Sequence, residues 1–127
     1  MGVIKILLAE DDDVMRSYLT RALERSGYGV SAVDRGTAAL ALLEGERFDL
    51  LLTDIVMPEM DGIELAQRAG DLAPDMRVMF ITGFAAVTLK AGKTMPQARV
   101  LSKPFHLREL VMEVDRMFEF ETASDQK

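Results

Sequence analysis

The sequence predicts an α/β fold in which helices cover both faces of a doubly wound, parallel sheet of five strands. Five short apolar runs alternate with segments of helical period along the 127 residues, which is typical of parallel sheets with right-handed crossovers. Three of these runs are almost continuously apolar, as expected for strands that helices bury on both sides. Because no repeat, linker or room for an output domain is evident, we expect one domain over residues 1–121 and a flexible polar tail over residues 122–127.

The predicted strands differ in strength. Residues 3–9, 48–53 and 78–82 form the strongest apolar runs, and residues 30–33 and 99–102 form weaker ones. Each run is short enough for a strand and is bounded by polar or turn-forming residues.

Helices are predicted where apolar residues recur three and four positions apart. Gly27 and Gly45 end the first two helices, and Asp61 is the expected N-cap of the third, with Glu64 as the acid of a capping box. The apolar positions that predict the first, second and last helices are Met15, Leu19, Ala22, Leu23, Leu40, Leu43, Leu107, Leu110, Val111, Val114, Met117 and Phe118.

The fourth helix is expected to be short or irregular. Only residues 85–91 carry a helical pattern there, and Gly92 and Pro96 interrupt the segment after them. We therefore expect a stub of helix and a mobile loop in this part of the chain.

Composition excludes several classes of site. The chain has no cysteine and a single histidine, which excludes disulfides, thiolate zinc sites, cysteine nucleophiles and multi-histidine metal sites. Its net charge of −6 and pI of about 4.8 should repel nucleic acid and anionic membranes. No apolar run approaches the ~18 residues that span a bilayer, and no signal peptide is evident, so we expect a cytoplasmic protein.

Polar residues follow the predicted strands at their carboxyl ends, where open parallel sheets bind ligands. Glu10 and Asp11 follow the first strand, Asp54 follows the third, Thr82 ends the fourth and Lys103 follows the fifth. Three adjacent carboxylates repel one another without a cation, and oxygen ligands of this kind favour Mg²⁺. A carboxylate can also attack phosphorus, with Lys103 and Mg²⁺ neutralising charge and the Thr82 hydroxyl available to a phosphoryl oxygen.

Each residue taken alone also has an ordinary structural explanation. The acids at positions 10–13 are typical of a helix start, and Asp54 could form a turn before Pro58. Thr82 could be a β-branched strand end, and Lys103 an exposed loop residue before a proline. The joint pattern is more specific, because four groups would have to reach strand ends by chance.

At these residues the sequence resembles the receiver domains of bacterial two-component response regulators, over about residues 4–120. The motifs are LAEDD at 8–12, LTDIVMPEMDG at 52–62, ITG at 81–83 and LSKPF at 101–105. The resemblance implies a flavodoxin-like receiver fold with strand order 2-1-3-4-5. A cis Lys103–Pro104 bond is frequent in this family.

The resemblance also implies roles for the residues at the strand ends. Asp54 would be the phospho-acceptor. Glu10, Asp11 and Asp54, with the backbone carbonyl of Val56, would hold Mg²⁺. Thr82 and Lys103 would bind the phosphoryl oxygens. No enzymatic activity is implied beyond self-phosphorylation from phosphodonors and slow autodephosphorylation.

A narrower resemblance, over residues 54–66, 79–87 and 100–110, is to CpdR-type single-domain response regulators of alphaproteobacteria. It implies phosphate transfer from a histidine kinase or histidine phosphotransferase in a cell-cycle phosphorelay. It also implies that the unphosphorylated protein primes ClpXP-type proteolysis, with a ClpX-like unfoldase as a partner. We expect Phe84, Val87, Leu89 and Met95 to form part of the docking patch.

One position departs from the wider family, in which an aromatic residue often swings inward on phosphorylation. Val100 occupies this position and is too small to act as such a switching residue. Phe84 is the nearest aromatic residue that could take over the role. Two other functions stay open. One is a phosphorelay shuttle or chemotaxis-like receiver that binds only kinases and phosphotransferases. The other is a Mg²⁺-dependent aspartyl phosphatase, although Val56 stands where such enzymes carry a second acid.

Overall fold

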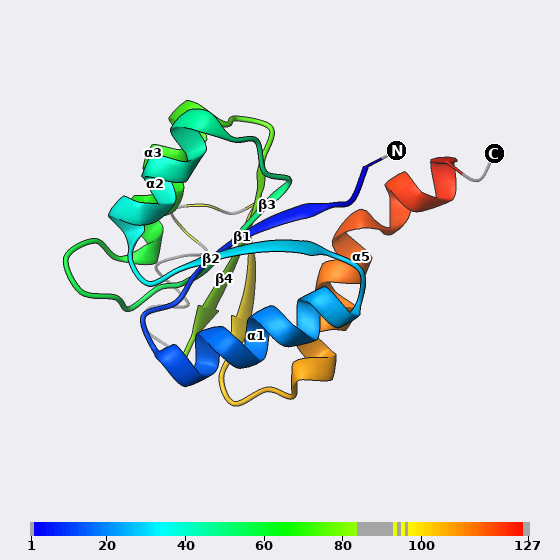
Figure 1. Ribbon diagram of the computed structural model, residues 1–127, viewed down its shortest axis with the longest axis horizontal. Helices are drawn as coiled ribbons and strands as arrows, with labels where there is room; N and C mark the ends of the chain where they lie inside the picture. Colours follow the sequence, from blue (N-terminus) through cyan, green and yellow to red (C-terminus); the bar gives the residue numbers. More distant parts are fainter. Residues whose placement is uncertain (1, 84–92, 94, 96, 126–127) are drawn as a thin grey trace.

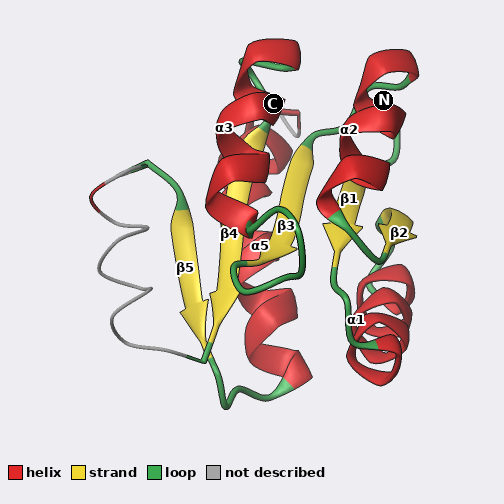
Figure 2. Cartoon of the chain, turned by 90° about the vertical axis from the view of Figure 1, so that its left-hand side faces the viewer, coloured by secondary structure: helices red, strands yellow, loops and turns green. Residues whose placement is uncertain are grey.

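The computed structural model describes residues 2–83, 93, 95 and 97–125, with side chains up to residue 119. Five parallel strands form one sheet in the order β2-β1-β3-β4-β5, which confirms the expected order. Figure 2 shows the strands side by side, with the arrowheads of β1, β4 and β5 directed toward the same edge. The strands are β1 Lys5–Ala9, β2 Gly29–Val33, β3 Leu50–Asp54, β4 Arg77–Thr82 and β5 Arg99–Ser102.

Two helix layers enclose the sheet (Figure 1). Helices α1 (Asp13–Arg25) and α5 (Leu107–Asp125) cover one face, and α2 (Gly36–Gly45) and α3 (Gly62–Leu72) cover the other. This is the doubly wound arrangement that the alternation of strands and helices predicts.

Strand β1 shows why the predicted strands are apolar at almost every position. Ile6 and Leu8 pack in the core under α1 and α5, whereas Leu7 and Ala9 pack in the core under α2 and α3. All four are fully buried. Successive side chains of a strand point to opposite faces, so burial on both faces requires an apolar residue at every position.

The helical apolar patterns mostly mark core positions. Leu19 and Leu23 of α1 are buried, as are Leu110, Val114 and Phe118 of α5. Their spacing of three or four residues places them on one side of each helix.

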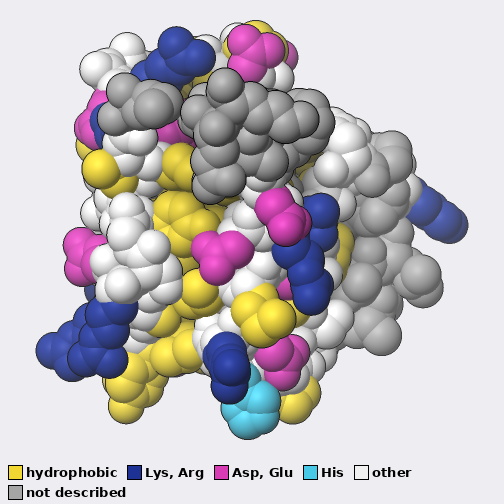
Figure 3. Space-filling view, turned by 90° about the vertical axis from the view of Figure 1, so that its right-hand side faces the viewer, with side chains coloured by type: hydrophobic (Ala, Val, Ile, Leu, Met, Phe, Trp, Pro, Cys, Tyr) yellow, Lys and Arg dark blue, Asp and Glu magenta, His cyan; other side chains and the backbone are white. Residues whose placement is uncertain are grey.

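Helix α5 differs from the expectation at both ends. Leu107, expected in the apolar stripe, is the first residue of the helix and is 36% exposed. Figure 3 shows hydrophobic side chains among charged ones on the side of the molecule that carries α5. Residues 122–125, expected in a flexible tail, continue the helix to Asp125, and residues 126 and 127 lie outside the described residues.

The predictions for the fourth helix lie outside the described residues, since these omit positions 84–92, 94 and 96. Met95 is described and is half-buried against the core under α2 and α3. Among the described helices, none combines the length and the apolar character that crossing a membrane requires.

Candidate functional site

Strand register brings the predicted site residues to one edge of the sheet. Ala9 pairs with Thr53, and Thr82 pairs with Ser102. Glu10 therefore leaves β1 beside the end of β3, where Asp54 is the last residue, and Lys103 leaves β5 beside Thr82. These groups come from positions 10 to 103 of the sequence, and only the parallel pairing unites them.

Three carboxylates form the centre of this edge. Oxygen atoms of Glu10, Asp11 and Asp54 all lie within 4.8 Å of one another. Glu10 is 1% exposed and Asp54 7% exposed, whereas Asp11 is open to solvent. The acidic cluster that the sequence predicts is therefore present, with two of its members buried.

The run of four acids divides into two pairs. Asp12 is the N-cap of α1, and its carboxylate accepts a hydrogen bond from the Met15 amide at 2.9 Å. Asp13 pairs with Arg16 at 2.6 Å on the helix surface. Glu10 and Asp11 thus belong to the acidic cluster, whereas Asp12 and Asp13 belong to the start of α1. The interpretation as a cation site and the interpretation as a helix start each hold for two of the four acids.

Glu10 is the least well satisfied group of the cluster. Its Oε2 accepts the Asp12 amide at 3.1 Å, but its buried Oε1 accepts no hydrogen bond within the described part of the chain. Burial raises the pKa of Glu10 to about 7, and the nearby charge of Asp54 acts in the same direction. An ionised oxygen without a partner is costly in this position, and three carboxylates so close together could hold a hard divalent cation.

Lys103 supplies the positive charge that the described part of the site contains. Its Nζ lies 3.4 Å from Asp54 Oδ2 and 3.9 Å from Glu10 Oε1. The Lys103 amide donates to the Thr82 carbonyl oxygen at 2.7 Å, which holds the β5 end against β4. The Lys103–Pro104 bond is cis, in agreement with the resemblance to receiver domains.

Thr82 and Val56 flank the cluster in different ways. Thr82 is fully buried at the end of β4, one position beyond Ile81, which pairs with Asp54. Val56 lies two residues beyond Asp54 in the loop after β3, and its side chain is exposed. Phe84, expected to take part in switching, lies outside the described residues, and Val100 packs partly against the core under α2 and α3.

Sequence reasoning missed three groups that position the acids. Gly62 lies directly against the Asp54 backbone. Thr53 Oγ1 donates to the Asp54 carbonyl oxygen at 2.8 Å, and Arg16 donates to the Glu10 carbonyl oxygen at 3.0 Å. The Asp61-Gly62 pair predicts a helix start and closes the motif at residues 52–62 that contains Asp54, but the motif does not show that the two backbones touch.

Comparison with known proteins agrees with this geometry. Residues 6–115 match the response regulator receiver domain. The chain belongs to the response regulator receiver family. It is 60% identical to the response regulator receiver protein CpdR of Brucella abortus, over 89% of this chain and 95% of that protein.

Other receivers share the fold. The chain is 35% identical to part of the sensor kinase CckA of Brucella abortus, over 93% of this chain but 13% of the kinase. A solved receiver domain of the hybrid histidine kinase CckA superposes with a TM-score of 0.75 at 32% identity, covering 88% of this receiver and 96% of that chain. A CheY-like receiver of Methanospirillum hungatei reaches a TM-score of 0.86 at 28% identity, covering 97% and 99% of the two chains.

Proposed function

We propose that this receiver is switched by phosphorylation of Asp54, with Mg²⁺ as cofactor and a histidine kinase or histidine phosphotransferase as donor. The observation that carries the proposal is the acidic cluster itself. Asp54 ends β3 within 4.8 Å of the Glu10 and Asp11 oxygens and 3.4 Å from the Lys103 amine. A nearly buried carboxylate beside a cation site and a lysine is suited to act as a nucleophile toward phosphorus.

In the proposed reaction, an Asp54 carboxylate oxygen attacks the phosphorus of a phosphohistidine or of a small acyl phosphate. The new bond is O–P, and the bond that breaks is N–P or O–P. The leaving imidazole or carboxylate keeps the electron pair, and the imidazole takes a proton from solvent. No acid in the chain needs to donate that proton.

The chain's own residues balance the charge of this step. Lys103 neutralises negative charge on the phosphoryl oxygens, and the Thr82 hydroxyl donates to one of them once the group is attached. Glu10, Asp11, Asp54 and the Val56 carbonyl oxygen would hold Mg²⁺. When bound, the ion supplies further charge neutralisation at the phosphoryl oxygens.

Mass spectrometry of the intact protein tests the proposal. Incubation with acetyl phosphate should add one phosphoryl group when Mg²⁺ is present and none when it is chelated. Asp54→Asn should abolish the addition. Asp75→Asn, which changes an exposed aspartate in the turn before β4, should leave it unchanged. Addition that persists in Asp54→Asn would overturn the assignment.

We further propose that the unphosphorylated receiver is an adaptor that primes a ClpX-like unfoldase, in the cytoplasm and within a cell-cycle phosphorelay. The 60% identity to CpdR over most of both chains supports this extension. Met95, expected in the docking patch, is half-buried, so at most part of its side chain is available there. Phe84, Val87 and Leu89 lie outside the described residues.

A binding titration against the N-terminal domain of ClpX separates the adaptor from a phosphorelay shuttle. An adaptor should bind in the free form and more weakly after acetyl phosphate treatment, with Asp54→Ala still binding. Equal affinity of both forms would exclude the switch. Absence of binding in either form would favour the shuttle. An aspartyl phosphatase is less well supported, because the acid it needs is replaced by Val56.

A further inference from the structure

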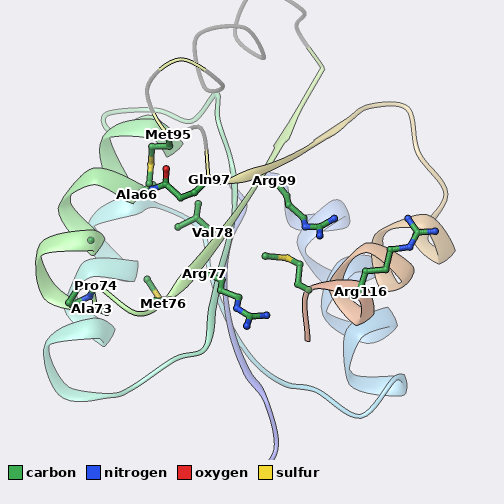
Figure 4. A pocket seen from close by; sticks show the side chains of 12 residues that line it. Ala66, Ala73, Pro74, Met76, Arg77, Val78, Met95, Gln97, Arg99 and Arg116 are labelled. Carbon is green, nitrogen blue, oxygen red and sulfur yellow. The ribbon is translucent and has the colours of Figure 1, made fainter. Parts of the chain in front are cut away.

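An open cavity of about 500 Å³ lies at the edge of the sheet opposite the acidic cluster. It is lined by residues from α3, β4, β5 and α5, as Figure 4 shows. Arg77 begins β4 and Arg99 begins β5, whereas Thr82 and Ser102 end these strands. The cavity is thus separated from the proposed phosphorylation site by the length of the strands, about 3.3 Å for each residue.

The wall of this cavity is apolar and adaptable. Met76, Met95 and Met117 line it, together with Ala66 and Val78. The three methionines are half-buried, so part of each side chain stays accessible. Unbranched methionine side chains adjust to the shape of a partner, which is why they are frequent on binding surfaces.

Arginines surround the same space. Arg77, Arg99 and Arg116 all line the cavity. Arg99 and Arg116 share one carboxylate, since Nη1 of Arg99 lies 2.9 Å and Nη1 of Arg116 lies 2.6 Å from the two oxygens of Glu113. One acid therefore serves two guanidinium groups, so Arg99, Arg116 and Glu113 together carry a net positive charge at this rim, on a chain whose net charge is −6.

Arg77 is held differently from the other two arginines. Its guanidinium lies 4.6 Å from the centroid of the Phe118 ring, a cation–π contact with α5. The ring holds the side chain beside the cavity, while the side chains of Arg99 and Arg116 are 46% and 56% exposed. Arg99 and Arg116 are therefore the arginines that a ligand can reach without disturbing the core.

We propose that this cavity binds an acidic peptide segment of a partner protein, with an apolar side chain against the methionines and a carboxylate at Arg99 and Arg116. Glu113 already demonstrates that a carboxylate can bridge these two guanidinium groups, and arginine pairs of this kind recognise acidic motifs. A polyanion such as nucleic acid fits less well, because the rest of the acidic chain repels it. The inference is independent of the proposed phosphorylation of Asp54.

The proposal makes Glu113 a competitor of the ligand. Removing the Glu113 charge frees both arginines for the peptide, so Glu113→Gln should strengthen binding. Removing the arginines should weaken binding. These opposite effects come from residues that contact each other, so general destabilisation of the surface cannot produce both.

The test begins with selection of displayed random peptides of about twelve residues against the intact chain. Affinities of the enriched peptides are then measured by fluorescence anisotropy. The variants are Arg99→Gln/Arg116→Gln and Glu113→Gln. Arg21→Gln/Arg25→Gln on α1 is the matched control, because it removes two exposed arginines elsewhere. Circular dichroism melts verify that each variant is folded.

Enriched peptides should combine Asp or Glu with Leu, Met or Phe. Arg99→Gln/Arg116→Gln should raise their Kd by roughly tenfold or more, Glu113→Gln should lower it, and the control should change it less than about twofold. Acetyl phosphate should still modify Asp54 with the peptide bound.

Several results would overturn the proposal. These are failure to enrich peptides, enrichment without acidic residues, an equal loss in the control, and weaker binding by Glu113→Gln. Binding to anionic lipid vesicles but not to peptides would also overturn it. So would a dimer that Arg99→Gln/Arg116→Gln dissociates, because the face would then belong to a second copy of the chain.

Discussion

Gly62 packs so closely on Asp54 that a Cβ atom at position 62 would lie 2.2 Å from the Asp54 carbonyl oxygen. The Gly62 amide also donates to the Ile55 carbonyl oxygen at 2.8 Å. The first residue of α3 thus rests on the backbone that carries the proposed phospho-acceptor. A contact this short leaves no room for a side chain, because the opposing atoms belong to the backbone of a buried strand.

Gly62→Ala should therefore displace either the start of α3 or the end of β3. We expect a loss of about 2 kcal/mol or more in the free energy of unfolding, as for other overpacked buried sites, and slower labelling of Asp54 by acetyl phosphate. Gly70→Ala is the matched control. It lies in the same helix with open space around it, and it should stabilise the protein by about 0.5–1 kcal/mol. Urea denaturation measures both, and equal effects would contradict the packing argument.

Glu10 should make the metal-free protein less stable as pH rises. Burial raises the pKa of Glu10 from an ordinary 4.5 to about 7 in the folded state. Between these values the folded state keeps a proton that the unfolded state has lost, so stability falls as pH rises through this window. One pKa unit corresponds to about 1.4 kcal/mol, which sets an upper limit of roughly 3–4 kcal/mol for the whole effect.

The comparison of wild type with Glu10→Gln isolates this contribution. Urea denaturation without Mg²⁺ at several pH values should give a difference in unfolding free energy that shifts in favour of Glu10→Gln as pH rises. Saturating Mg²⁺ should reduce that dependence in the wild type. A difference that is independent of pH would contradict the raised pKa.

Asp11 should bind the cation while destabilising the metal-free fold. Removing its charge relieves repulsion with Glu10 and Asp54. We expect Asp11→Asn to weaken Mg²⁺ binding by at least roughly tenfold, or about 1.4 kcal/mol, and to raise Tm without Mg²⁺. Asp13→Asn is the control, since Asp13 belongs to the same acidic run but pairs with Arg16 outside the cluster. A lower Tm for metal-free Asp11→Asn would show that Asp11 is structural.

The Tyr28 hydroxyl should stabilise the fold by connecting the turn before β2 with helix α5. Its hydroxyl donates to the Asp115 carboxylate, 87 positions away in the sequence. Tyr28→Phe should cost about 1 kcal/mol of unfolding free energy, the contribution of a typical hydrogen bond, because this bond lies at the exposed surface. Tyr18→Phe provides the control, because Tyr18 is exposed on α1. Equal unfolding free energies of the two variants in urea denaturation would contradict a stabilising role for this hydrogen bond.

Asp61 and Glu64 illustrate how far local patterns reach. The Asp61 side chain accepts the Glu64 amide at 2.8 Å, as the N-cap pattern predicts. The Glu64 carboxylate, however, pairs with Arg68 one turn later at 2.9 Å. Backbone amides at a helix start have fixed positions, so the cap is predictable. A long exposed side chain can reach several neighbouring groups, so its partner cannot be predicted from the local sequence.

Local sequence was sufficient to predict the strands, the N-cap of α3 and the five side chains at the strand ends, because alternation and capping depend on neighbours in the chain. Three other relationships became evident only in the folded molecule: Gly62 touches Asp54, a Glu10 oxygen is buried without a hydrogen-bond partner among the described residues, and Arg99 and Arg116 share Glu113. Those relationships depend on the register of strands and the packing of helices distant in sequence. The positions of residues along the chain do not indicate which side chains such packing brings into contact.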